Sequence, residues 1–221
     1  WWLKSISLCN PLEENPNNHR AIHAKGLVYS NDLKEYDKGL EFYNKAININ
    51  STVGKYYRNR ALLYEMQYKD FDKALDDYNK AVKLDPKDDF NYLYRAKFYA
   101  YTMNQNDKAI LDFYKLMEID PNRPYYYYQR AVFYRENLKL YDKAIIDLDK
   151  AIKLDSSNSQ YYSYRSDCFI DMNKLDKALK DSNKAIELEP ENDSYYYYRT
   201  SIYELLNNID LAFEDYNKAI E

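Results

Sequence analysis

The sequence predicts an all-α fold, an array of about six antiparallel helical hairpins within 221 residues. A phrase of the form DKAxxDxNKA returns along most of the chain, and such repetition is typical of helical arrays. Apolar residues recur at helical spacing within each copy, as Tyr127, Ala131 and Tyr134 do at i, i+4 and i+7. The 3 glycines and 6 prolines leave little turn chemistry for an all-β fold.

Each copy contains a helix A followed by a helix B. The small residue near the start of helix B lies at Gly39, Ala74, Ala109, Ala144, Ala178 and Ala212, so the period is 35 residues three times and then 34 twice. Aspartates open helix B, where their charge opposes the helix dipole, at Asp72, Asp107, Asp142, Asp176 and Asp210. Prolines end helix B at Pro86, Pro121 and Pro190. We assign the repeats to about 18–52, 53–87, 88–122, 123–157, 158–191 and 192–221.

The two ends of the chain suggest further repeats. Pro16 precedes Gly26 by ten residues, as Pro190 precedes Thr200, so we interpret residues 1–17 as the worn helix of a preceding repeat or an N-terminal cap. The last phrase stops at NKAIE, where another copy runs on to NKAIELEP. We therefore expect the chain to be a fragment of a longer protein.

Composition argues against several classes of function. The net charge of −4 does not favour a nucleic-acid partner, which needs a basic face. No apolar run is long enough to span a membrane, and the 2 cysteines give a mild preference for a reduced compartment such as the cytoplasm. The sequence spells no phosphate loop, CxxC or HExxH motif, and His19 and His23 lack an evident third metal ligand. We expect no enzyme, no cofactor and no metal site.

The order of aromatic and small residues in each copy resembles the tetratricopeptide repeat. In the fourth copy these residues are Tyr127, Ala131, Tyr134, Ala144 and Ala151. The resemblance covers about nine-tenths of the chain and implies a right-handed α-solenoid with a concave groove that receives a protein or peptide. It therefore implies a protein-binding scaffold. The alternatives are a substrate-recruiting or assembly module of a larger enzyme or complex and, less favoured, an RNA-binding helical repeat.

Two departures from the family pattern have structural consequences. The first four copies carry one extra residue near the turn between helix A and helix B. Leu116 replaces the second small residue of the third copy, and we expect this overfilled slot to loosen the helix packing there.

Comparison of the copies with one another separates scaffold from recognition, because slots that recur serve packing and slots that vary are available for binding. Tyr57 and its counterparts Tyr92, Tyr127, Tyr162 and Tyr196 recur and are predicted to be core. The preceding slot, which holds Tyr56, Asn91, Tyr126, Tyr161 and Tyr195, is predicted to pack on the preceding repeat. The remaining helix-A slots vary, and helical spacing places them on one face.

We predict that this variable face forms a partner-binding groove. It contains Arg58, Asn59, Phe90, Leu93, Tyr94, Lys97, Tyr101, Tyr125, Tyr128, Gln129, Arg135, Tyr164, Asp167, Asp171, Tyr197 and Tyr198. Basic residues in the earlier copies give way to acidic residues in the later ones. We expect a segment that is apolar or proline-rich in the middle, acidic toward repeats two to four and basic toward repeats five and six.

A second recurrent feature is polar. Arginines precede the small slot of helix A, at Arg60, Arg95, Arg130, Arg165 and Arg199, and aspartates recur on helix B, at Asp77, Asp112, Asp147, Asp181 and Asp215. The first copy lacks both, with Lys25 and Phe42 instead. We predict a buried structural ladder of Arg–Asp pairs.

Overall fold

The computed structural model describes residues 15–220, and within that range every regular element is a helix. Most of the predicted N-terminal element, residues 1–14, lies outside the described residues. The A helices are α3 (His19–Leu27), α5 (Gly54–Leu63), α7 (Asp89–Lys97), α9 (Pro124–Glu136), α11 (Ser159–Asp171) and α13 (Asp193–Leu205). The B helices are α4 (Tyr36–Ile49), α6 (Phe71–Leu84), α8 (Asn106–Ile119), α10 (Tyr141–Leu154), α12 (Leu175–Leu188) and α14 (Ile209–Lys218). The all-α fold predicted from the sequence is confirmed.

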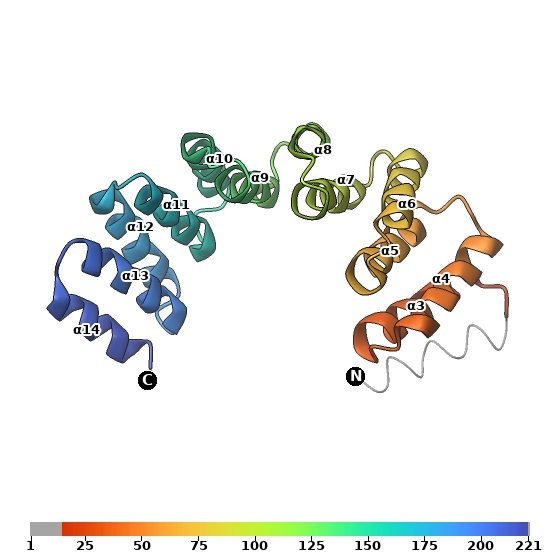
Figure 1. Cartoon of the computed structure of the whole chain (residues 1–221), viewed down its shortest axis with the longest axis horizontal. Helices are drawn as coiled ribbons and strands as arrows, with labels where there is room; N and C mark the ends of the chain where they lie inside the picture. Colours follow the sequence, from red (N-terminus) through yellow and green to blue (C-terminus); the bar gives the residue numbers. More distant parts are fainter. Residues whose placement is uncertain (1–14, 221) are drawn as a thin grey trace. The chain divides into compact units, whose positions relative to one another are not determined.

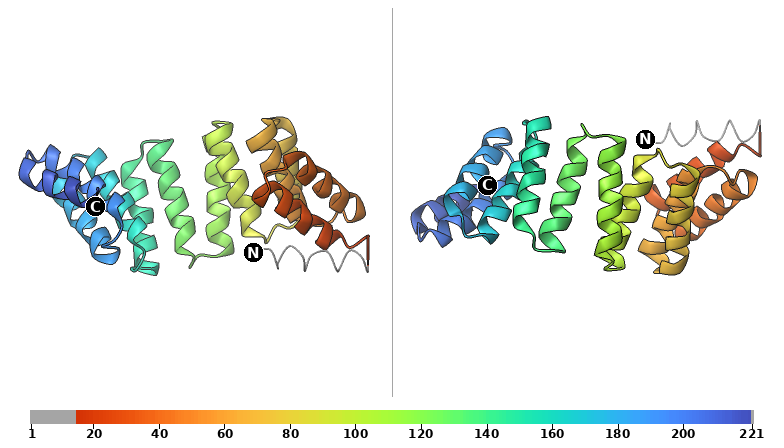
Figure 2. Two further views of the ribbon diagram at one scale, coloured as in Figure 1. Left: turned by 90° about the horizontal axis from the view of Figure 1, so that it is seen from below. Right: turned by 90° about the horizontal axis from the view of Figure 1, so that it is seen from above.

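The chain divides into two compact units, Trp1–Phe98 and Tyr99–Glu221. In unit 1, α3 packs on α4 and α5 on α6, and α7 packs on α6 (Figure 1). In unit 2, α8 packs on α9, and the pairs α9–α10, α11–α12 and α13–α14 form hairpins (Figure 1). Figure 2 shows the two helices of each of these hairpins running in opposite directions. Short connections between neighbouring helices favour this antiparallel packing.

Small residues let helix A and helix B approach closely. Ala61, Ala74, Ala131 and Ala144 are fully buried. The first repeat has glycine instead, and a Cβ at Gly26 would lie 2.7 Å from the ring of Tyr43. The bulk of Tyr43, which is 2% exposed, therefore explains the glycine. Leu116 is fully buried, and looser packing around it stays a prediction.

The extra residue of the first four repeats is absorbed at the end of helix A. In repeats one to three, helix A ends in a wider π-helical turn: η1 (Val28–Asp32), η2 (Tyr64–Tyr68) and η3 (Phe98–Thr102). The turn is closed by a bond that spans six residues in repeats one to four, for example from Leu140 N to Tyr134 O, and five residues in repeats five and six, for example from Lys174 N to Phe169 O. One added residue therefore widens the turn at the end of helix A.

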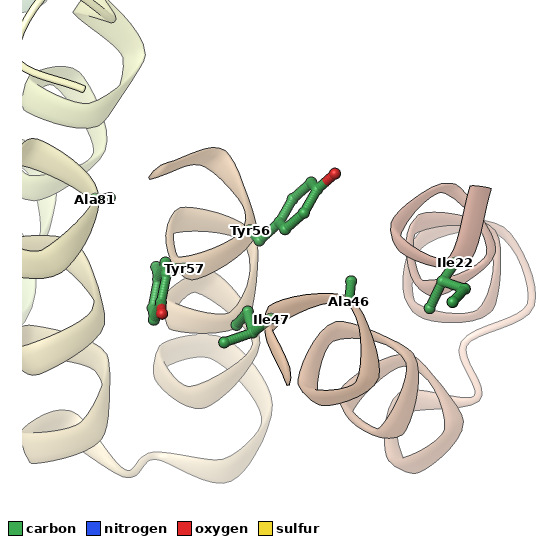
Figure 3. Close-up of a cluster of buried hydrophobic side chains, with 6 residues drawn as sticks. All are labelled: Ile22, Ala46, Ile47, Tyr56, Tyr57 and Ala81. Atoms are coloured by element: carbon green, nitrogen blue, oxygen red, sulfur yellow. The ribbon is translucent and has the colours of Figure 1, made fainter. Parts of the chain in front are cut away.

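The recurrent tyrosines of helix A join neighbouring repeats. In Figure 3, Tyr56 points toward α3 and Tyr57 toward α6, in a cluster that includes Ile22, Ile47 and Ala81. The Tyr56 hydroxyl lies 2.7 Å from His19 Nδ1 of the preceding repeat. In four repeats the next tyrosine donates its hydroxyl to the carbonyl six residues earlier: Tyr57 to Ser51, Tyr127 to Pro121, Tyr162 to Ser156 and Tyr196 to Pro190. Tyr127 and Tyr196 are half-buried rather than buried. Through these hydrogen bonds, the predicted core slot also anchors the loop before helix A.

The predicted Arg–Asp contact is confirmed in four repeats, where each arginine makes two bonds to the aspartate. Arg130 donates from Nε and Nη2 to the two carboxylate oxygens of Asp147, both at 2.7 Å. Asp147 is 3% exposed, and burial raises its pKa while the bonds from Arg130 act against that rise. The corresponding pairs are Arg60–Asp77, Arg165–Asp181 and Arg199–Asp215.

Candidate functional site

In unit 1, contacts between neighbouring A helices occupy much of the predicted binding face. Arg58 Nη1 donates to Asp88 Oδ2 at 2.6 Å and to Asn91 Oδ1 at 2.7 Å. Its guanidinium also lies 5.6 Å from the ring centre of Phe90, which is 41% exposed. The positive charge predicted to attract an acidic partner is therefore already paired inside the protein.

The other predicted residues of unit 1 differ in accessibility. Leu93 is 3% exposed, so its assignment to the binding surface is corrected to packing. Asn59 bonds His23 Nε2 at 2.9 Å, which commits its amide to the preceding repeat. Tyr94 and Lys97 are half-buried, and burial lowers the pKa of Lys97. Among the predicted residues of this unit, Phe90 and part of Tyr94 therefore remain as accessible aromatic surface.

In unit 2, the aromatic residues of α9 and α11 pack on one another. Tyr128 lies with its ring centre 5.1 Å from Tyr164, 5.4 Å from Tyr161 and 6.3 Å from Tyr125. It is 6% exposed, which corrects its assignment as a surface contact. Tyr128 instead supports Tyr125, which is 39% exposed, and Tyr164, which is half-buried.

An ionic network borders these tyrosines. Arg135 on α9 lies 2.8 Å from Asp171 and 3.3 Å from Asp167, both on α11. Its guanidinium lies 5.8 Å from the ring centre of Tyr164, whose hydroxyl donates to Glu136 at 2.9 Å. Burial raises the pKa of Asp167 to about 6, against the opposing effect of Arg135. In this unit, the basic and acidic residues that the sequence predicts to contact a partner are therefore paired with one another.

We define the tyrosine face as Tyr101, Tyr125, Gln129 and Tyr164 with the bordering residues Arg135, Glu136, Asp167 and Asp171. Tyr101, near the end of η3, is 48% exposed, and burial of its hydroxyl, followed by the charge of Glu136, raises its pKa to about 12. Gln129 is half-buried. The face is thus aromatic with a partly charged edge.

The last repeat has its own exposed aromatic pair. Tyr197 and Tyr198 are 58% and 49% exposed. With Tyr216, Ile220 and neighbouring residues of α13 and α14 they line an open hollow of about 430 Å³.

Two kinds of contact were missed from the sequence. The arginines of the ladder also reach the B helix of the preceding repeat: Arg60 bonds Asn44, Arg95 bonds Asn79, Arg165 bonds Asp149 and Arg199 bonds Asn183. At the equivalent slot, Arg130 lies 4.8 Å from the ring centre of Tyr114. The recurrence of one slot every 34 or 35 residues was the signal that could have shown this. The second kind of contact joins neighbouring A helices through variable slots, as Arg58 does with Asn91. No sequence signal distinguishes these slots from variable slots that remain accessible.

The histidines and the described cysteine serve packing. His19 bonds Tyr56 and Asn50, and His23 stacks on Tyr56 at 4.4 Å between ring centres. The described residues hold no group of three or more metal-ligating side chains. Cys168 is fully buried, and burial raises the pKa of its thiol to about 12, which is unlike a reactive thiolate. Within residues 15–220, no helix is both long and apolar enough to cross a membrane.

Comparison with known proteins identifies the repeat. A family profile, the tetratricopeptide repeat, matches residues 19–52, 54–88, 124–158 and 160–192. No curated protein matches the sequence.

Solved structures share the fold at low sequence identity. The Cut9–Hcn1 hetero-tetramer of the APC/C matches with a TM-score of 0.73 and 13% identity, over 96% of this chain and 42% of that one. A tetratricopeptide repeat protein from Parabacteroides merdae matches with a TM-score of 0.71 and 21% identity, over 96% and 83%. YrrB, a tetratricopeptide protein with an unusual peptide-binding site, matches with a TM-score of 0.58 and 23% identity, over 80% and 90%. The chain thus spans less than half of the first of these proteins.

Proposed function

Because the chain belongs to the tetratricopeptide-repeat family, we propose that it is a protein-interaction scaffold that binds a partner segment on the A-helix face of unit 2. Proteins of this family are typically interaction scaffolds and generally not enzymes. The observation that carries the proposal is the exposure of aromatic side chains in the slots that vary between repeats. Tyr101 and Tyr125 remain 48% and 39% exposed, whereas recurrent small residues such as Ala131 and Ala144 are buried.

Tyrosine suits such a surface for physical reasons. It offers a large contact area with few side-chain torsions to order, and its hydroxyl can bond backbone groups of a partner. Tyr164 is held in place by Tyr128 on one side and by its bond to Glu136. Such a pre-ordered ring loses little conformational entropy on binding.

The alternative is an assembly module in a larger complex or enzyme. It is favoured by the similarity to Cut9–Hcn1, a hetero-tetramer in which the matched chain is more than twice as long. The two proposals differ in the surface that they use, because assembly can occupy any face of the helices.

A partner titration with matched variants tests the proposal. A partner isolated from native extract should bind Tyr125→Ala and Tyr164→Ala at least about tenfold more weakly than the wild-type chain. The matched control is Ile146→Ala on α10, a side chain that is 66% exposed and lies outside the tyrosine face. Tyr128→Ala would not isolate binding, because removing a buried ring also destabilises the fold. Loss of binding only in Ile146→Ala would instead place the interface on the B helices.

A further inference from the structure

Resting on the proposed function, we propose that the tyrosine face binds a proline-rich segment that carries a basic residue. The face and its charges lie within unit 2. Three properties of the face favour this occupant: its backbone chemistry, the shape of its aromatic groups and the balance of its charges.

The face offers mainly side chains. Between their first and last turns, α9 and α11 bond their backbone groups along the helix. An extended segment lying there would find few backbone acceptors for its amide N–H groups, and burying such groups unpaired is unfavourable. Proline carries no amide hydrogen, so a proline-rich segment avoids this cost. Its carbonyl oxygens can accept from phenol hydroxyls such as that of Tyr101.

The aromatic rings are arranged as a supported row. Tyr125 lies 6.3 Å from Tyr128, and Tyr128 lies 5.1 Å from Tyr164 in an edge-on contact. The buried ring of Tyr128 therefore fixes two accessible rings on neighbouring A helices. Polyproline helices dock on aromatic-lined surfaces of this kind, and their preformed shape limits the entropy lost on binding.

The charges of the face favour a cation. Among the residues that define the face, Arg135 pairs with Asp167 and Asp171. The third carboxylate, that of Glu136, accepts from the Tyr164 hydroxyl. Three carboxylates thus stand against one guanidinium. Glu136 and Asp171 are exposed, and each is the last residue of its helix, α9 or α11. The negative ends of two helix dipoles therefore add to the carboxylate charge. This balance reverses the sequence-based expectation of an acidic segment at repeat four, because Arg135 is already paired.

A random peptide library displayed on phage gives the first test. Peptides selected on the wild-type chain should be enriched in proline and in arginine or lysine, and should lose binding to Tyr164→Ala. Tyr164→Phe, which keeps the ring, should retain most of the binding. Selected peptides that need Tyr164 but form amphipathic helices or lack a basic residue would overturn this inference and leave the proposed function standing. Peptides that are indifferent to both Tyr125→Ala and Tyr164→Ala would overturn both.

A labelled oligoproline peptide with one central arginine gives the second test, by fluorescence polarisation. Replacing its arginine by glutamate should raise Kd at least about tenfold at low salt. The double variant Glu136→Gln with Asp171→Asn should weaken the arginine peptide and leave the alanine version of the peptide unchanged. Asp142→Asn, an exposed carboxylate at the start of α10, is the control and should change neither. Equal binding of the arginine and glutamate peptides to the wild-type chain would overturn the inference.

Discussion

Single arginine side chains join the two helices of a repeat by donating two hydrogen bonds to one carboxylate. The guanidinium of Arg199 reaches Asp215 of its own repeat through two bonds of 2.6 Å and Asn183 of the preceding repeat through a third of 2.6 Å. One residue thus fixes both the hairpin and its neighbour. Because guanidinium geometry matches a carboxylate edge to edge, lysine would not serve in its place.

Removing one partner of this ladder should destabilise the protein strongly. Asp147→Ala leaves the half-buried Arg130 without its carboxylate, and breaking a buried pair costs about 3–5 kcal/mol. Chemical denaturation of the full chain measures the loss. Asp142→Ala, an exposed aspartate on the same helix, is the matched control and should cost much less. Equal losses in the two variants would contradict a structural role for the buried pair.

At the scale of the elements, each repeat has one residue in the left-handed backbone conformation in the turn between helix A and helix B. These residues, all with positive φ, are Lys34, Lys69, Asn104, Lys139, Asn173 and Asn207. Asparagine tolerates this conformation better than lysine does, and glycine tolerates it best. The turn is therefore strained in three of the six repeats.

Relieving that strain should stabilise the protein. Lys139 has φ 54°, so Lys139→Gly is expected to raise the free energy of unfolding by about 0.5–1 kcal/mol, observed as a higher Tm. Lys153→Gly, within the last turn of α10, should instead lower the stability, because glycine is a poor helix former. A Tm that falls in both variants would argue against strain at the turn.

At the scale of the whole molecule, each unit contains a buried titratable group with a shifted pKa. The two shifts change the stability of their units in opposite directions as the pH falls. Burial, with Lys55 and Arg58 nearby, lowers the pKa of His23 in unit 1 to about 4. Its other neighbours are Tyr43, Tyr56 and Asn59. In unit 2, burial raises the pKa of Asp167 to about 6.

Acidification should therefore weaken unit 1 and strengthen unit 2. The unfolded chain binds a proton at His23 below its ordinary pKa of 6.5, whereas the folded unit does not until about 4, so stability falls as pH drops through this window. From about pH 7 to about pH 5.5 the loss is about 1 kcal/mol. Asp167 works the other way, because the folded unit takes up its proton first, and partial exposure keeps that gain smaller.

Hydrogen exchange resolved by segment measures both changes in the full chain. Amides of α3 and α5 should lose protection on acidification, and those of α11 should gain it. His23→Gln, which cannot titrate, should remove most of the response of unit 1. An unchanged pH response in that variant would show that another group is responsible.

The predictability of this protein follows from its repetition. Comparison of the repeats with one another predicts the all-α hairpin array and the Arg–Asp contacts from sequence alone. It does so because the residues needed for each packing contact recur in several repeats. The slots of Leu93 and Tyr128 vary between repeats, and the sequence therefore predicts that they are exposed. The structure shows both side chains to be buried, since a variable residue can pack on an equally variable neighbour, as Tyr128 does on Tyr164.

The sequence by itself therefore determined the helices, their period and the family, since these depend on local spacing and on residues that recur. Only the tertiary structure decided which charges remain available to a partner. Arg58 lies 30 residues from Asp88, and Arg135 lies 36 residues from Asp171. Neither pairing is visible in a helical pattern, because each joins neighbouring A helices whose relative rotation is set by packing. Once formed, the pairs cancel the charges that the linear sequence displays.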